Sequence, residues 1–175
     1  MTTHQDALAT LIAKDEIRDL ALLYSRGVDR KDAALLRSLY TKDGMDYHGQ
    51  FFEGTAEAYV QFLEQGLPHM RYSGHHICNH LISVDGNEAE GEVYALAYHI
   101  LPDGKGGYVE DLQPCRYVDR YRKEDGLWRF AQRVVEFDVR RTVPAPFVDT
   151  PAPDPLKDAS YTTLSSPLFA RGARS

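Results

Sequence analysis

The hydrophobic pattern of the chain changes at Pro68, and this change limits the possible folds more than any other feature. Before Pro68, apolar residues recur at the three- and four-residue spacing that places side chains on one face of a helix. These residues are Ile17, Leu20, Ala21, Tyr24 and Val28. After Pro68, four long segments rich in Val, Ile, Tyr or Phe cover residues 71–84, 89–101, 108–123 and 127–139. Because the helices precede the strands instead of alternating with them, the pattern predicts an α+β fold.

The breaks between these four segments have the composition of tight turns. They read Asp85-Gly86-Asn87, Asp103-Gly104-Lys105-Gly106-Gly107 and Glu124-Asp125-Gly126. Gly, Asn and Asp tolerate the left-handed backbone that short hairpin loops require. We therefore expect an antiparallel meander, with the N-terminal helices laid against one curved sheet.

The first helix is expected to end near Gly27, because a charged stretch over residues 26–32 marks a turn there. This places Asp29 at a helix terminus. A second short helix is predicted over about residues 31–40 and a hairpin over 46–52, with its turn at 48–50. A third helix is predicted from residue 54 to about 67.

The last stretch, residues 142–175, contains six prolines and shows no sustained periodicity. Such a segment is extended or disordered. Its scattered apolar side chains leave two alternatives open, which are disorder and docking over the domain or a neighbouring subunit. We therefore divide the chain into a folded domain at residues 1–141 and a Pro-rich tail at residues 142–175.

The charge balance argues against nucleic acid and membrane surfaces as partners. The chain has 20 Lys and Arg against 26 Asp and Glu, a formal net charge of −6, and no run of Lys. Cys78 and Cys115 are the two cysteines and have no C-x-x-C spacing, so neither a disulfide framework nor a thiolate zinc site is indicated. The N-terminus lacks a basic segment followed by a long apolar run, which predicts a cytoplasmic protein without a signal peptide or membrane span.

The densest polar patch lies at residues 72–80, which hold three of the seven histidines. In a strand, alternation places His75 and Asn79 on one face. His76 and His80 then lie on the other face, so the three imidazoles cannot meet at one metal ion. In a helix His76 and His80 would form half of a zinc site, but Gly74 and the downstream turn favour a strand. We expect no metal here, and histidines that only bond to neighbours on a half-exposed strand remain the alternative to a functional site.

Three further residues are either site residues or ordinary structural groups. His99 shares its strand face with Ala95 and Ala97, whose small side chains leave room for a cavity, although a solvated strand end explains it equally well. Asp29 is either functional or part of a surface ion pair. Tyr47, in the predicted hairpin, is by default a packing residue. Glycine-rich phosphate loops and a Gly-x-Ser-x-Gly elbow are absent, so nucleotide and serine-hydrolase functions have no support.

Three stretches of the chain share the order and spacing of a known family. They are Leu22-Leu23-Tyr24-Ser25-Arg26-Gly27-Val28-Asp29, Gly74-His75-His76-Ile77-Cys78-Asn79, and Arg116-Tyr117-Val118-Asp119-Arg120-Tyr121 continuing to Arg133. Over about residues 7–141 the chain resembles the SnoaL-like group of the nuclear-transport-factor fold. This group includes scytalone dehydratase, bile-acid dehydratases, polyketide cyclases and hexachlorocyclohexane dehydrochlorinase. The resemblance implies a cone-shaped α+β barrel, in which a curved antiparallel sheet and N-terminal helices enclose an apolar cavity.

The same resemblance implies a set of catalytic residues. Asp29 and His75 correspond to the Asp–His dyad of the dehydratase-like members. His99 stands at the position of a second histidine, and Tyr47 at that of a tyrosine that orients the substrate carbonyl through water. Tyr24 matches the bile-acid enzymes and is expected to bind substrate.

The chain also departs from scytalone dehydratase at three positions. Val28 replaces a tyrosine, and Cys115 and Tyr117 replace a serine and an asparagine. We expect Cys115 and Tyr117 to contact the substrate, and the departures argue against scytalone itself as that substrate.

Together these features predict a lyase of aromatic compound catabolism that needs no cofactor and eliminates a leaving group, usually water, from a small hydrophobic cyclic or aromatic compound. His75 would abstract a proton and Asp29 would support it. The same groups could instead release formaldehyde from a lignin-type diarylpropane through a quinone methide, or serve an isomerase or polyketide cyclase. A non-catalytic ligand-binding module is a further alternative, because fold does not fix function. We expect a homo-oligomer, with a homotrimer favoured over a dimer.

Overall fold

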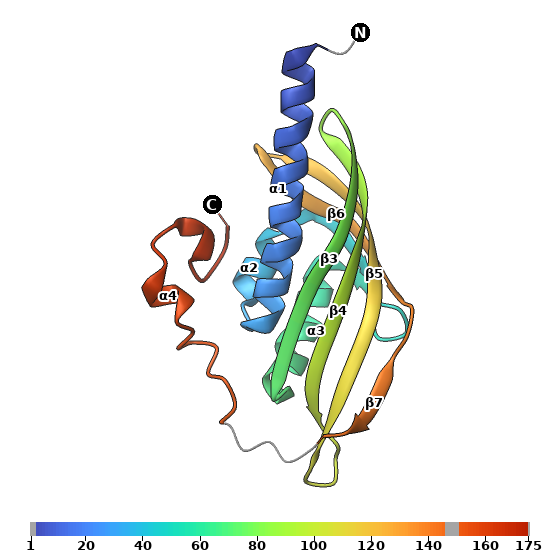
Figure 1. The fold of residues 1–175 in the computed structure, drawn as a ribbon, viewed down its shortest axis with the longest axis vertical. Coiled ribbons are helices and arrows are strands. Elements are labelled where there is room, and N and C mark those ends of the chain that lie inside the picture. The colour runs from blue at the N-terminus through green and yellow to red at the C-terminus, as the bar shows by residue number, and fades with distance from the viewer. Residues whose placement is uncertain (1–2, 146–150, 175) are drawn as a thin grey trace.

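The computed structural model describes residues 3–145 and 151–174 (Figure 1). Its helices are α1 (His4–Asp29), α2 (Ala33–Ser38), α3 (Ala56–Gly66) and α4 (Ser160–Thr163), with 3-10 turns at Leu67–His69 and Pro167–Phe169. Its strands are β1 (Tyr40–Tyr47), β2 (Glu53–Thr55), β3 (Tyr72–Asp85), β4 (Glu88–Pro102), β5 (Tyr108–Glu124), β6 (Leu127–Phe137) and β7 (Arg141–Pro144). The helices come first and the long strands follow, so the predicted α+β class is confirmed.

One curved sheet runs through the molecule in the strand order β2-β1-β6-β5-β4-β3. Strands β3 to β6 form the predicted antiparallel meander. Strand β1 begins at Tyr40, earlier than the predicted hairpin, and pairs in parallel with β6. The prediction missed this pairing because it joins segments far apart in the chain, whereas turn composition reports only on neighbours.

The helices cover the concave side of the sheet (Figure 1). The sheet does not close on itself, since β2 and β3 are its two edges. Helix α1 lies along β3, and α3 lies against β1. Large side chains from both layers fill the space between them, including Leu20, Leu36, Val60, Tyr121, Trp128 and Phe130. The helices and the curved, open sheet thus enclose one apolar core.

Strand β3 contains a bulge that changes which histidines face the helices. Its register against β4 shifts between Ile77 and His80. Two successive residues, Cys78 and Asn79, are both exposed, so the strand contains one residue more than strict alternation allows. His80 therefore returns to the side that carries His75 and Ile77. The predicted alternation is therefore wrong beyond Ile77, because a bulge places two residues opposite one and periodicity alone does not show where this happens.

The end of the chain returns to the helices after the sheet is complete. Strand β7 pairs with the first part of β5, and the predicted boundary at residue 141 falls on its first residue. Residues 146–150 and 175 of the predicted tail lie outside the described residues. The C-terminal segment, defined here as residues 151–174, lies beside α1 and α2 (Figure 1). No helix in the described parts of the chain is long and apolar enough to cross a membrane.

Candidate active site

Asp29 and His75 meet where the end of α1 lies against β3. Nδ1 of His75 lies 2.7 Å from Oδ1 of Asp29. The same carboxylate accepts hydrogen bonds from the Ser73 hydroxyl and from the backbone N–H of His75, both at 3.0 Å. Because an ionised carboxylate can only accept, Nδ1 carries the proton of this bond. The structure thus brings these two predicted residues together, with side chains that are 15% and 8% exposed.

His75 forms part of the wall of a pocket of about 180 Å³. Most of the wall is apolar and is supplied by Val28, Phe51, Phe62, Leu63, Leu67, Met70, Leu101 and Phe137. The ring of His75 bonds to Asp29 through Nδ1. Its other nitrogen, Nε2, has no hydrogen-bond partner among the described residues. A neutral imidazole held in this tautomer has a free acceptor nitrogen beside the pocket and can take up a proton there.

His99 lies beside His75 on the neighbouring strand β4. Their ring centroids are 5.4 Å apart, and the ring planes are inclined at 65°. Burial lowers the pKa of His99 to about 4, and the adjacent His75 contributes to the lowering. His99 is therefore neutral at pH 7, with one donor and one acceptor nitrogen. His99 lines the pocket. The small side chains of Ala95 and Ala97 on the same strand face are consistent with this position in a cavity wall.

A buried carboxylate that the sequence analysis missed lies in the wall near His99. Asp111 accepts bonds from Nε and Nη2 of Arg140 at 2.8 and 3.1 Å, from the Thr142 hydroxyl at 2.8 Å, and from the amide of Gln113. Although burial opposes it, the bond from Arg140 and its companions hold the pKa of Asp111 below its usual value. Alternation along β5, counted back from Cys115, would have indicated Gln113 and Asp111 as inward-facing.

His48, in the loop after β1, adds a further polar side chain to the pocket wall. Its Nδ1 lies 3.1 Å from Asp46, and its ring stacks on Tyr59 at 5.0 Å. Asp46 is fully buried and also accepts a bond from the Tyr40 hydroxyl at 2.7 Å. Tyr24, the predicted substrate-binding residue, lines the pocket with its hydroxyl 2.7 Å from that of Tyr59.

Three other predicted site residues do not line this pocket. Tyr47 follows the buried Asp46 on β1, and strand alternation turns its side chain away from the pocket, which the neighbouring His48 lines instead. Cys115 and Tyr117 face inward but lie in the core beneath the pocket. The Cys115 thiol donates to the carbonyl of Ala95 at 3.7 Å. Direct substrate contact by these two residues is therefore not supported.

The described residues offer no ready-made metal site. Within residues 3–145 and 151–174, no group of three or more His, Cys, Asp and Glu side chains is arranged to hold a metal ion. The most buried carboxylate of the pocket wall, Asp111, already pairs with Arg140.

Three solved structures show the same fold. A scytalone dehydratase-like protein from Novosphingobium aromaticivorans is 24% identical, with a TM-score of 0.69 over 78% of this chain and 91% of that chain. The hexachlorocyclohexane dehydrochlorinase LinA-type3 from Novosphingobium barchaimii is 18% identical, with a TM-score of 0.71 over 83% and 99% of the two chains. A nuclear transport factor 2-like protein with a cystatin-like fold, also from N. aromaticivorans, is 20% identical, with a TM-score of 0.56 over 79% and 92%. No curated protein matches the sequence.

The sequence comparison with protein families gives a match over most of the chain. The SnoaL-like domain matches residues 9–134, which include most of α1, the sheet from β1 to β5 and most of β6. Asp29, His75 and His99 all lie inside the matched region. The chain therefore belongs to the SnoaL-like domain family.

Proposed function

We propose that this protein is a cofactor-independent lyase that acts on a small hydrophobic cyclic or aromatic compound, with His75 as its base. One observation carries the proposal, which is a His–Asp pair beside an apolar pocket with one ring nitrogen left free. Two solved structures of the same fold bear names that denote the removal of water and of hydrogen chloride from a substrate. Elimination chemistry is common to both names and needs only a base and a leaving group.

In the proposed reaction, Nε2 of His75 accepts a proton from the carbon next to the one that carries the leaving group. The electron pair of the broken C–H bond forms the new double bond as the bond to the leaving group breaks. When the leaving group is hydroxide, the imidazolium returns the proton to it, so water departs and the base is regenerated. Asp29 orients the ring through Nδ1 and stabilises the imidazolium while it exists.

Other residues of the pocket wall supply groups that could stabilise negative charge on a substrate oxygen. His99 is neutral and offers one N–H donor. Arg140, which is 37% exposed at the edge of the pocket, keeps a positive charge beside Asp111. Because most of the lining is apolar, such donors act more strongly on developing charge than they would in water.

The size of the pocket narrows the substrate class. An apolar cavity of about 150 Å³ takes up benzene. The volume of about 180 Å³ found here therefore corresponds to one six-membered ring with small substituents. A larger substrate would place its reacting ring inside the pocket and leave the remainder near the exposed edge.

Three probe compounds test this function. They are a hexachlorocyclohexane, followed by chloride release; scytalone, followed by loss of water; and a para-hydroxylated diarylpropane-1,3-diol, followed by formaldehyde release. We expect turnover of at least one probe. The substitution His75→Ala should lower kcat for that probe about 100- to 10,000-fold, because general-base catalysis supplies an effect of this size. The substitution Asp29→Asn should lower kcat in the same direction.

His76→Ala is the matched control, because His76 is the next residue on β3 and its side chain is exposed. Its kcat should equal that of the wild type, and denaturant unfolding should show that every variant is folded. A folded His75→Ala protein with activity within a few-fold of wild type would remove His75 from the mechanism. If no probe turns over and apolar ligands bind equally at pH 5 and pH 8, the protein is a binding module instead.

A further inference from the structure

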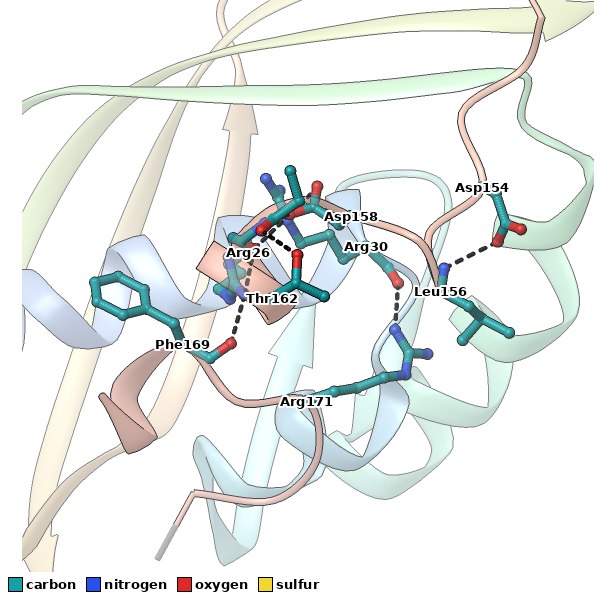
Figure 2. Close-up of polar contacts among 10 residues, drawn as sticks. Arg26, Arg30, Asp154, Leu156, Asp158, Thr162, Phe169 and Arg171 are labelled. Atoms are coloured by element: carbon teal, nitrogen blue, oxygen red, sulfur yellow. Dashed lines mark hydrogen bonds and ion pairs between the residues drawn. The ribbon is translucent and has the colours of Figure 1, made fainter. Parts of the chain in front are cut away.

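The C-terminal segment contacts the last turn of α1 just before the dyad carboxylate (Figure 2). Arg26 lies about one helical turn before Asp29. It donates to the backbone carbonyl of Phe169 at 2.6 Å and to Oγ of Ser160 at 2.9 Å. The Arg26 guanidinium also lies 5.2 Å from the ring centroid of Tyr161. The segment thus makes two hydrogen bonds and one cation–π contact with Arg26, a part-buried arginine on α1.

A second set of contacts lies just after Asp29. Arg171 donates from one terminal nitrogen to the carbonyl of Arg30 at 2.9 Å (Figure 2). Its other terminal nitrogen donates to the carbonyl of Lys31, also at 2.9 Å. Because a guanidinium is planar and its donors are fixed in a fork, one side chain can satisfy two adjacent carbonyls at the same time. The backbone on the C-terminal side of Asp29 is therefore fixed as well.

Two further bonds strengthen the same region. Arg30 forms an ion pair with Asp158 at 3.2 Å, and both side chains are about three-tenths exposed. The backbone N–H of Gly172 donates to Oδ2 of Asp32, the residue whose side chain caps α2. The contacts of the segment thus bracket Asp29 in sequence, from Arg26 to Asp32.

These contacts bear on Asp29 because it is the last residue of α1. The end of a helix leaves carbonyl groups without partners inside the helix, and it opens more readily than the middle. A carboxylate at this end also faces the negative pole of the helix dipole. Arg171 binds the carbonyl of the C-cap residue Arg30 and that of Lys31 just beyond the helix, and it brings a positive charge to the helix end.

We propose that Arg171, together with Arg26, is a positioning residue through which the C-terminal segment holds Asp29 at bonding distance from Nδ1 of His75. Neither arginine lines the pocket, so any effect on the reaction must pass through Asp29. The inference rests on the proposed function, because only a catalytic dyad needs this distance to be kept constant.

Arg174 provides a matched control within the same segment. Its backbone N–H donates to Oγ of Ser38 at 2.9 Å, and its side chain donates to the carbonyl of Trp128 at 3.3 Å. These contacts join the segment to the end of α2 and to β6, away from the turn that carries Asp29. Arg174→Ala should therefore loosen the segment without moving the dyad.

Proton NMR of the full-length protein tests the proposal without a substrate. A short bond to a carboxylate moves the Nδ1–H proton of His75 far downfield, and the resonance is identified by its loss in His75→Gln. We expect this resonance in the wild type and in Arg174→Ala, and its loss or severalfold weakening in Arg171→Ala. With the hexachlorocyclohexane, scytalone or diarylpropane-diol probe that turns over, Arg171→Ala should lower kcat about 10- to 100-fold while KM changes less than about twofold, since slight misplacement of a catalytic group costs this much.

The possible failures are distinguishable. If Arg171→Ala keeps the full resonance and the wild-type kcat, the positioning role is overturned and the proposed function stands. If the wild type itself lacks the resonance, the dyad is overturned and the positioning role with it. Should Arg171→Ala fail to fold, Arg171→Lys serves instead, because an ammonium group keeps the charge but cannot span two carbonyls. An unchanged resonance in Arg171→Lys would then overturn the positioning role.

Discussion

The fold contains two acid–base pairs that differ in their surroundings. Asp119 and Arg133 are fully buried, whereas Asp29 and His75 are part-buried, and His75 lines a pocket. Nε and Nη2 of Arg133 donate to the two oxygens of Asp119 at 2.8 and 2.7 Å, and neither side chain is exposed. The Tyr121 hydroxyl donates a third bond to Asp119 at 2.9 Å.

Aromatic rings complete the enclosure of Arg133. Its guanidinium carbon lies 4.2 Å from the ring centroids of Tyr24 and Tyr117 and 4.1 Å from that of Phe130. A guanidinium does not lose its proton in a protein. This pair therefore joins β5 to β6, and Arg133 packs against Tyr24 of α1, but the pair has no proton to exchange.

The pair of Asp29 and His75 uses similar electrostatics to a different end. Its imidazole has a second nitrogen without a partner among the described residues, and this nitrogen belongs to a pocket-lining side chain. A carboxylate–base pair is thus structural when other side chains enclose the base, and it can take part in proton transfer when the base faces a pocket. The difference is one of surroundings and of the identity of the base, since both acids are aspartates.

Replacing Arg133 with Met should produce the largest loss of stability. It leaves Asp119 buried and unpaired, which costs about 3–5 kcal/mol. Urea unfolding of Arg133→Met measures the loss, and the double variant Arg133→Met/Asp119→Leu should recover much of it because no buried charge remains. A loss below about 1 kcal/mol in the single variant would mean that Asp119 is solvated, and the contrast with Asp29 would disappear.

Lowering the pH should lower the free energy of unfolding, because His99 is harder to protonate in the folded protein than in the unfolded chain. Its pKa is about 4 in the folded protein, held down by burial and His75 against the opposing pull of Asp111 and Asp29, whereas the ordinary value is 6.5. Between these pH values the unfolded chain binds a proton that the folded chain does not. Stability therefore falls as the pH drops from 6.5 towards 4, by up to about 3 kcal/mol.

Urea unfolding at pH 7 and pH 4.5 measures this loss of stability. We expect a smaller loss in His99→Gln than in the wild type, because the variant has no imidazole to protonate at this position. His76→Gln is the control, since its side chain is exposed and its removal should leave the loss unchanged. Equal losses in His99→Gln and the wild type would show that burial does not keep His99 neutral.

An exposed ion pair should give the smallest effect. Arg116 donates to Asp138 at 3.0 to 3.2 Å and to Glu92 at 3.1 Å on the outer face of the sheet. Solvent screens such charges, and holding long side chains in place costs entropy. The midpoint of urea unfolding of Arg116→Ala should match that of the wild type within error. A loss as large as that of Arg133→Met would show that enclosure does not decide the value of a charge pair here.

Local pattern was sufficient for most of the architecture and for part of the site. The four strands were predicted nearly to the residue because glycine-rich turns separate long runs of β-branched and aromatic residues. The end of the first helix was equally visible, and with it the place of Asp29. Family resemblance then paired Asp29 with His75, and the structure places the two side chains in contact.

The inward-facing positions of other residues were not all predicted from periodicity. The bulge in β3 moved His80 to the helix-facing side, and the longer β1 put His48 in the pocket where Tyr47 was expected. Alternation along β5 indicates the inward position of Asp111, but not its partner Arg140, which comes from beyond the end of β6. Each case turns on a one-residue change in strand phase or on a contact between distant segments.

The sequence by itself determined the order of helices and strands, the turns and the residue types available for proton transfer, because these follow from side-chain pattern and local backbone preference. The tertiary structure decided which of those residues share a pocket, which carboxylate pairs with a guanidinium enclosed by aromatic rings, and where the C-terminal segment docks. These outcomes depend on sheet curvature, strand register and the parallel pairing of β1 with β6. Such features join residues far apart in the chain, so no local pattern encodes them.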